Sequence, residues 1–173
     1  MSTETNLSSG IDDYVVDTPE MRDFMDGVRA AISRNHDDIE TGLESLRPAF
    51  ARLLADQNWL PEQYAGINPT SGMGGGIGQW LLFRGADRSL SLFSLVVPAG
   101  SATPVHDHLA WGLVGLYRGE QEETVYRRVD DGSTPDHAKL VVDEVRRLRP
   151  GDYYLLLPPE GDIHGVRTTS EDP

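Results

Sequence analysis

The alternation of hydrophobic and polar positions divides the chain into a helical first part and a strand-rich second part. Thr18-Pro19-Glu20 combines a capping hydroxyl, a first-turn proline and an acidic side chain, which is typical of a helix start. Apolar residues at helical spacing follow in three stripes: Phe24, Met25, Val28 and Ile32; Ile39, Leu43 and Leu46; and, after Pro48, Phe50, Leu53 and Leu54. This pattern predicts a helical segment over 17–66 that packs on the rest of the chain, after a disordered or loosely attached N-terminus over 1–16.

From Ile77 onward the hydrophobic period changes to two, which favours β-strands. The predicted strands are Gln79–Arg84, Ser89–Val97, Trp111–Tyr117, Glu122–Val129, Lys139–Leu148 and Tyr153–Leu157, with Gly-, Pro- and Asp-rich turns between them. About seven or eight short strands at this density indicate a mainly β fold, an antiparallel barrel or jelly roll over 67–173.

A chain of 173 residues is most simply a single domain. Its composition limits the kinds of partner that it can bind. The formal net charge is −13, and Lys139 is the sole lysine. Without a basic stripe, nucleic acid and anionic membranes are poor partners. No segment approaches the about 18 consecutive apolar residues that span a bilayer, and the N-terminus lacks the features of a signal peptide, so we expect a cytoplasmic protein. The chain has no cysteine, which excludes disulfides and thiolate ligands.

Candidate chemistry centres on His106-Asp107-His108, within the stretch from Gly100 to Gly119. On an extended strand, residues two apart point to the same side, so both rings could meet one metal ion. His164, after the strand that follows Gly151, is the candidate third ligand. Three imidazoles are a common ligand set for first-row metals.

These residues resemble the two motifs of the cupin superfamily. Gly100 with His106-x-His108 and the later Gly119 is similar to the first motif, and Gly151 with Pro159-x-Gly161-x-x-His164 is similar to the second. The resemblance implies a cupin double-stranded β-helix, a jelly-roll barrel, preceded by the helical segment. It also implies that both motifs bind one metal ion through His106, His108 and His164. Many cupins carry a glutamate ligand shortly after the second histidine, whereas this chain has Gly112 and Leu113 there.

A ligand set of three histidines resembles that of the thiol dioxygenases, and the residues Thr103 to Leu116 look like the bacterial branch of that family. The resemblance implies an Fe(II)-dependent enzyme that uses O2 to oxidise a small thiol carboxylate, 3-mercaptopropionate or cysteine, to its sulfinic acid. Mn, Ni and Zn stay open as alternative metals. Another metal-dependent cupin enzyme, or a non-enzymatic cupin that binds a metal or small ligand, stays open as an alternative function. The oligomeric state is not indicated.

The same resemblance implies a substrate-binding arginine, for which Arg84 is the candidate because a guanidinium suits a carboxylate. A solvent-facing Arg84 at a hairpin end is the alternative. The family also carries a Ser-x-His and a tyrosine on a strand soon after the third ligand. This chain ends at Pro173, where that strand is expected, so either the C-terminal part is missing or the network is absent. We therefore expect an incomplete sheet edge.

Overall fold

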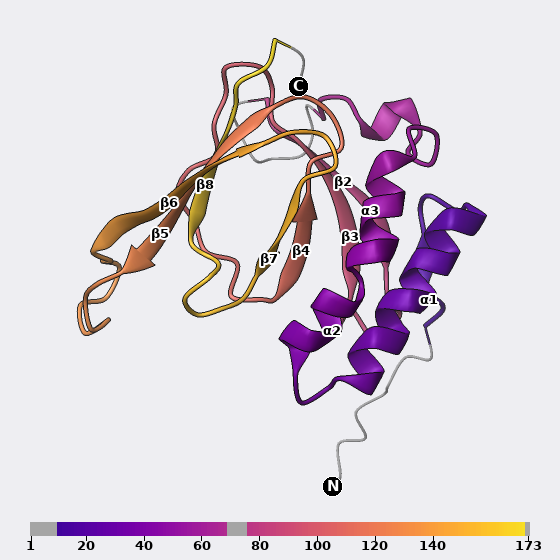
Figure 1. The fold of residues 1–173 in the computed structure, drawn as a ribbon, viewed down its shortest axis with the longest axis horizontal. Helices are drawn as coiled ribbons and strands as arrows, with labels where there is room; N and C mark the ends of the chain where they lie inside the picture. The colour runs from indigo at the N-terminus through magenta and orange to yellow at the C-terminus, as the bar shows by residue number, and fades with distance from the viewer. Residues whose placement is uncertain (1–9, 69–75, 172–173) are drawn as a thin grey trace, which may run out of the picture.

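A computed structural model describes residues 10–68 and 76–171, and Figure 1 shows its arrangement of helices beside strands. Of the described residues, strands make up 32% and helices 23%, in three antiparallel sheets and three α-helices, so the expected mainly β fold is confirmed. None of the helices in the described ranges is long and apolar enough to cross a membrane.

The three helices form one layer beside β2 and β3 (Figure 1). They are α1 (Pro19–Arg34), α2 (Ile39–Ser45) and α3 (Arg47–Ala55). Thr18 caps α1, because its side-chain oxygen accepts a hydrogen bond from the Met21 amide at 3.2 Å. The apolar stripes predicted from the sequence are buried against Leu82 and Phe83 of β2, so the helical segment shares one hydrophobic core with the first sheet.

That first sheet has the order β1-β2-β3 and contains one strand that the sequence pattern misses. Strand β1 (Asp13–Tyr14) pairs with β2 (Gly78–Arg84), which forms a hairpin with β3 (Ser91–Val96). Val16 is 2% exposed within the core. The prediction of a loose segment over 1–16 is therefore wrong for its last residues, because pairing with β2 holds them in place. Residues 1–9, 69–75 and 172–173 lie outside the described residues.

Two further sheets complete the β part, in the orders β4-β7 and β6-β5-β8. Their strands are β4 (Gly112–Gly115), β5 (Gln121–Arg128), β6 (Leu140–Leu148), β7 (Tyr153–Leu156) and β8 (His164–Thr168). Each predicted strand from Gln79 to Leu157 is present, with ends that differ by at most two residues. In Figure 1 the β5–β6 hairpin reaches away from the helical layer.

The free edge of β8 is covered by residues 101–106, which run antiparallel to it. The amide of Thr103 donates to the carbonyl of Val166 at 2.8 Å, and His106 and His164 exchange both backbone hydrogen bonds, at 3.0 and 2.9 Å. The incomplete sheet edge expected at the C-terminal end is therefore not found at β8 in the described part of the chain. This pairing fixes the first histidine motif against the second.

Candidate metal centre

Three histidines from distant parts of the chain form one cluster. The ligand atoms of His106, His108 and His164 all lie within 4.8 Å of one another, so these residues could hold a metal ion. Their ring centroids are 4.8 to 5.0 Å apart. His164 is the first residue of β8, whereas His106 and His108 lie in the connection between β3 and β4. The three predicted ligands are therefore brought together.

The backbone of the first two histidines differs from the expectation. We expected both on one extended strand, but His106 forms only an isolated bridge to His164, and His108 lies in a loop. The bridge holds the backbones of His106 and His164 side by side. The turn after it brings the ring of His108 back toward the other two, so the rings meet by loop geometry rather than by strand alternation.

The ring of His106 has only one tautomer that suits its surroundings. Its Nδ1 lies 2.9 Å from the carbonyl oxygen of Pro104. A carbonyl oxygen only accepts hydrogen bonds, so Nδ1 must carry the proton and donate it. The lone pair of Nε2 on His106 is then available to a metal ion.

His164 lies deepest, at 4% exposed, and its ring contacts the buried Glu123 and the half-buried Tyr154. Its Nδ1 is 2.7 Å from Oε1 of Glu123 and 3.4 Å from the hydroxyl of Tyr154. Burial, followed by the charge of Glu123, raises the pKa of the Tyr154 phenol far above its usual value. Tyr154 is thus a neutral hydroxyl beside the cluster.

His108 is the most solvent-accessible of the three, and a carboxylate fixes its backbone. Oδ2 of Asp162, whose residue is 2% exposed, accepts from the amides of His108 at 3.1 Å and Leu109 at 2.8 Å. Desolvation of the His108 ring, reinforced by the neighbouring His164 and His106, lowers the pKa of His108. A lowered pKa keeps this imidazole neutral near pH 7, which is the form that binds metals.

The cluster contains imidazoles and no carboxylate. Gly112 and Leu113, the positions that the sequence comparison with cupin motifs singled out, pair with Leu156 and Leu155 in the β4-β7 sheet. Glu123 points at the far nitrogen of His164 and takes no place beside the Nε2 atoms. Among the described residues, the arrangement therefore offers a metal three neutral nitrogen ligands.

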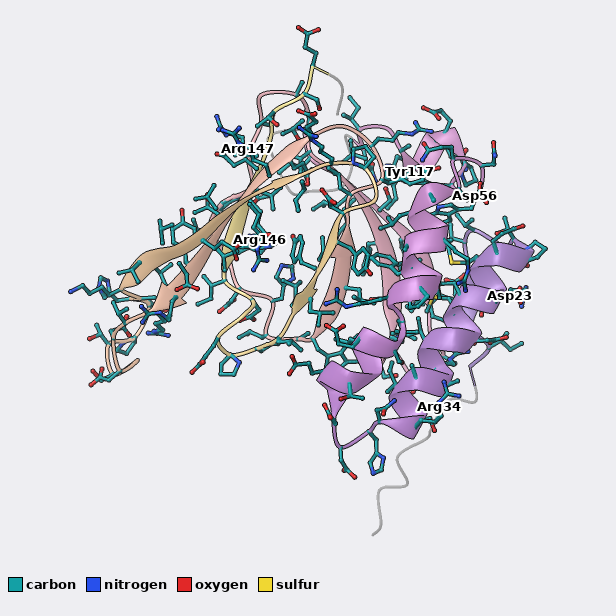
Figure 2. All side chains as sticks on the ribbon, in the orientation of Figure 1. Asp23, Arg34, Asp56, Tyr117, Arg146 and Arg147 are labelled. Atoms are coloured by element: carbon teal, nitrogen blue, oxygen red, sulfur yellow. The ribbon has the colours of Figure 1, made fainter. Side chains whose placement is uncertain are left out.

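A cavity of about 170 Å³ adjoins His164. Its polar lining includes Glu123, Arg146 and Tyr154, and its apolar lining includes Leu155, Leu157 and Ile163. In Figure 2, Arg146 and its neighbour Arg147 project to opposite sides of the β5–β6 ribbon. Arg146 donates to Oε2 of Glu123 at 3.3 Å, which links the cavity wall to the histidine cluster.

Arg84, the predicted substrate-binding residue, ends β2 and has another partner. Its guanidinium lies 3.1 Å from Oδ2 of Asp13 on β1, and about half of its side chain is exposed. Arg84 is not among the residues that line the cavity beside His164. Its role in substrate binding stays a prediction, and Arg146 is the arginine that the structure places near His164.

Glu123, Asp162 and Arg146 were not identified from the sequence. The alternation of β5 places Glu123 on the same side as Val125, and Val125 pairs with His164. That alternation is a usable signal, but it needs the pairing of β5 with β8, which the sequence pattern does not specify. Asp162 stands within Pro159-x-Gly161-x-x-His164, at a position that this motif leaves unspecified.

No known protein-family model matches this sequence.

Proposed function

We propose that the protein is an Fe(II)-dependent thiol dioxygenase on a cupin-type barrel. It would convert a small thiol carboxylate, 3-mercaptopropionate or cysteine, to the sulfinic acid. The observation that carries the proposal is the cluster of three imidazoles without a carboxylate ligand, next to a partly apolar cavity. The substrate partners would be the thiol and O2.

The spacing of two ring nitrogens in the cluster suits their binding to one shared metal ion. Nε2 of His108 and Nε2 of His164 lie 2.9 Å apart. Two nitrogens at about 2.1 Å from one ion lie about 3.0 Å apart at a right angle and about 3.4 Å apart at a tetrahedral angle. The observed spacing is close to both values, so the cluster suits a first-row metal, and Fe(II), Mn, Ni and Zn all stay compatible with it.

Bound Fe(II) would supply the charge that lowers the thiol pKa and the electrons that activate O2 beside the sulfur. The reaction balances as RSH + O2 → RSO2H, with both oxygen atoms ending on sulfur and the thiol proton on the acid.

The chain's own residues would bind the metal ion and orient the substrate. His106, His108 and His164 would hold the ion, with Pro104 and Glu123 fixing two of the rings. Tyr154, a neutral hydroxyl at the cavity wall, can donate a hydrogen bond to an oxygen or sulfur atom. We keep Arg84 as the candidate residue that binds the substrate carboxylate. Its ion pair with Asp13 would first have to open.

The proposal is tested by oxygen uptake. Protein loaded anaerobically with Fe(II) is given 3-mercaptopropionate, cysteine, or propionate as the matched acid without a thiol. We expect oxygen consumption and sulfinate formation with a thiol only, and neither in His164→Ala. Full iron occupancy without oxygen uptake for any thiol would contradict the proposal.

A different metal-dependent cupin enzyme is the second candidate, favoured by the pairing of Arg84 with Asp13. Unless that ion pair opens, no carboxylate anchor is available at Arg84. Oxygen uptake separates the two, because iron-loaded protein that consumes no oxygen with any thiol favours the second candidate. Arg84→Ala in the same assay tests the anchor. A rise in KM for the thiol carboxylate with little change in kcat supports Arg84, and unchanged kinetics would show that another group, such as Arg146, binds the carboxylate.

A further inference from the structure

Glu123 is buried in the interior, and its side chain interacts with His164, Arg146 and Tyr154. The residue is 1% exposed, and its two oxygens face different partners: Oε1 faces His164 Nδ1 at 2.7 Å, and Oε2 faces Arg146 Nη1 at 3.3 Å. A buried charge is costly unless it is paired and hydrogen-bonded. Both oxygens of Glu123 have such partners, and one of these partners is the candidate metal ligand His164.

We infer that Glu123 is a positioning residue that fixes His164 as the Nδ1–H tautomer and thereby directs its Nε2 lone pair at the metal. The inference rests on the metal site of the proposed function, but it is independent of the reaction and of the substrate.

The tautomer follows from the donors and acceptors at the two ring nitrogens. If the proton of neutral His164 were on Nε2, the lone pair of Nδ1 would face a carboxylate oxygen at 2.7 Å, and two acceptors would repel each other. With the proton on Nδ1, this contact becomes a hydrogen bond to a charged acceptor, which is the stronger kind. Nε2 of His164 is then an acceptor, so in the metal-free protein Nε2 of His108, 2.9 Å away, must be the donor.

The strands around Glu123 keep the carboxylate in this orientation. Glu123 pairs directly with Arg146 across the β5–β6 ladder, and its side chain lies diagonal to His164 across β5–β8. The guanidinium of Arg146 satisfies the oxygen that His164 does not use, and it also contacts Glu144 at 2.7 Å. Glu123 is therefore held from both neighbouring strands and does not depend on a loop.

The chain contains a matched control one residue away. Glu122 points to the opposite side of β5 and forms an ion pair with Arg167 at 2.8 Å. Glu122→Gln removes the same charge from the same strand without touching the cluster. Glu123→Leu removes the acceptor for His164, and Glu123→Gln keeps the shape and one carbonyl acceptor but loses the charge.

The first measurement is the tautomer of His164, read from the side-chain nitrogen shifts of full-length, ¹⁵N-histidine-labelled, metal-free protein. We expect a protonated Nδ1 in the wild type, in Glu122→Gln and in Glu123→Gln, and loss of this preference in Glu123→Leu. His164 protonated on Nε2 in the wild type would overturn the inference without any variant.

The second measurement is the Kd for Fe(II) and Co(II) under anaerobic conditions. Loss of such a ligand-orienting partner typically weakens metal binding about 10- to 100-fold. We expect that loss in Glu123→Leu, a smaller loss in Glu123→Gln and none in Glu122→Gln. If Glu123→Leu does not fold, Glu123→Gln decides, and a Kd equal to that of Glu122→Gln would overturn the inference.

These results separate the inference from the proposed reaction. A protein with the expected tautomer and metal affinities that oxidises no thiol would contradict the reaction alone. A thiol-oxidising protein in which His164 carries its proton on Nε2 would contradict the inference alone.

Discussion

The carboxylate of Asp162 accepts a hydrogen bond from the backbone amide of His108 at 3.1 Å, across 54 residues of sequence. The same oxygen also accepts from the amide of Leu109. Asp162 lies two residues before His164, so one buried side chain ties the loop of one metal ligand to the strand of another.

We expect Asp162→Ala to lower both stability and metal affinity, because two amides lose their acceptor and the loop of His108 is released. Each intramolecular hydrogen bond contributes about 0.5–1.5 kcal/mol net, so the loss of both costs about 1–3 kcal/mol in the free energy of unfolding. Asp162→Asn keeps an oxygen for these amides and should lose less. Urea unfolding and Co(II) titration measure the two effects. Asp107→Ala, at an exposed carboxylate between the first two ligands, is the control, and an equal loss there would contradict the role of Asp162.

The ligand set itself gives the second prediction. His106→Ala, His108→Ala and His164→Ala should each remove tightly bound metal, because each ring supplies one of three nitrogens. His137→Ala should leave metal content unchanged, because His137 is exposed in the connection between β5 and β6. Metal analysis of the purified variants checks this, and loss of metal from His137→Ala would mean that the ligand set is different.

The helices and most strands are predictable because their signals are local. Thr18 and Pro19 specify the start of α1, and alternation specifies strands such as β5 and β6. Strand β1 is not predictable in this way. Asp13–Tyr14 is only two residues long, and it is held as a strand by its pairing with Arg84 and Phe83 of β2.

Of the candidate site, only the three histidine ligands could be predicted from the sequence. Histidine is rare in this chain, and His106, His108 and His164 have the spacing of the motifs that they resemble. The sequence alone therefore identifies them as candidates. Their supports depend on tertiary pairing. Glu123 reaches His164 only because β5 pairs with β8 in one particular register, and a register is not encoded in any short window of sequence.

Gly115 provides a test of how the helical layer contacts the sheets. A Cβ at this position of β4 would lie 2.6 Å from Leu54 and 2.8 Å from the ring of Phe50, both on α3. Gly115→Ala should therefore overpack this contact and cost about 1–3 kcal/mol in the free energy of unfolding. Gly112→Ala is the control on the same strand, since its Cβ would meet only Leu156 at an ordinary 3.8 Å. Urea unfolding curves compare the two, and equal stability would contradict close packing of α3 on β4.

Asp130 gives a pH prediction away from the metal cluster. Its carboxylate accepts from the Lys139 amide, from Arg128 at 2.8 Å and from the Gly132 amide at 2.8 Å, at the tip where β5 turns toward β6. These hydrogen bonds, led by that of Lys139, lower the pKa of Asp130 from 3.8 to about 2. The folded state thus favours the ionised carboxylate, so the stability that this carboxylate contributes is fully present above pH 4 and is lost as the pH falls toward 2.

We expect the Lys139 amide of the metal-free wild type to lose hydrogen-exchange protection over this range. In Asp130→Asn that protection should be lower at pH 5 and should change less between pH 5 and 2. An identical pH dependence in the two proteins would show that Asp130 does not hold this turn.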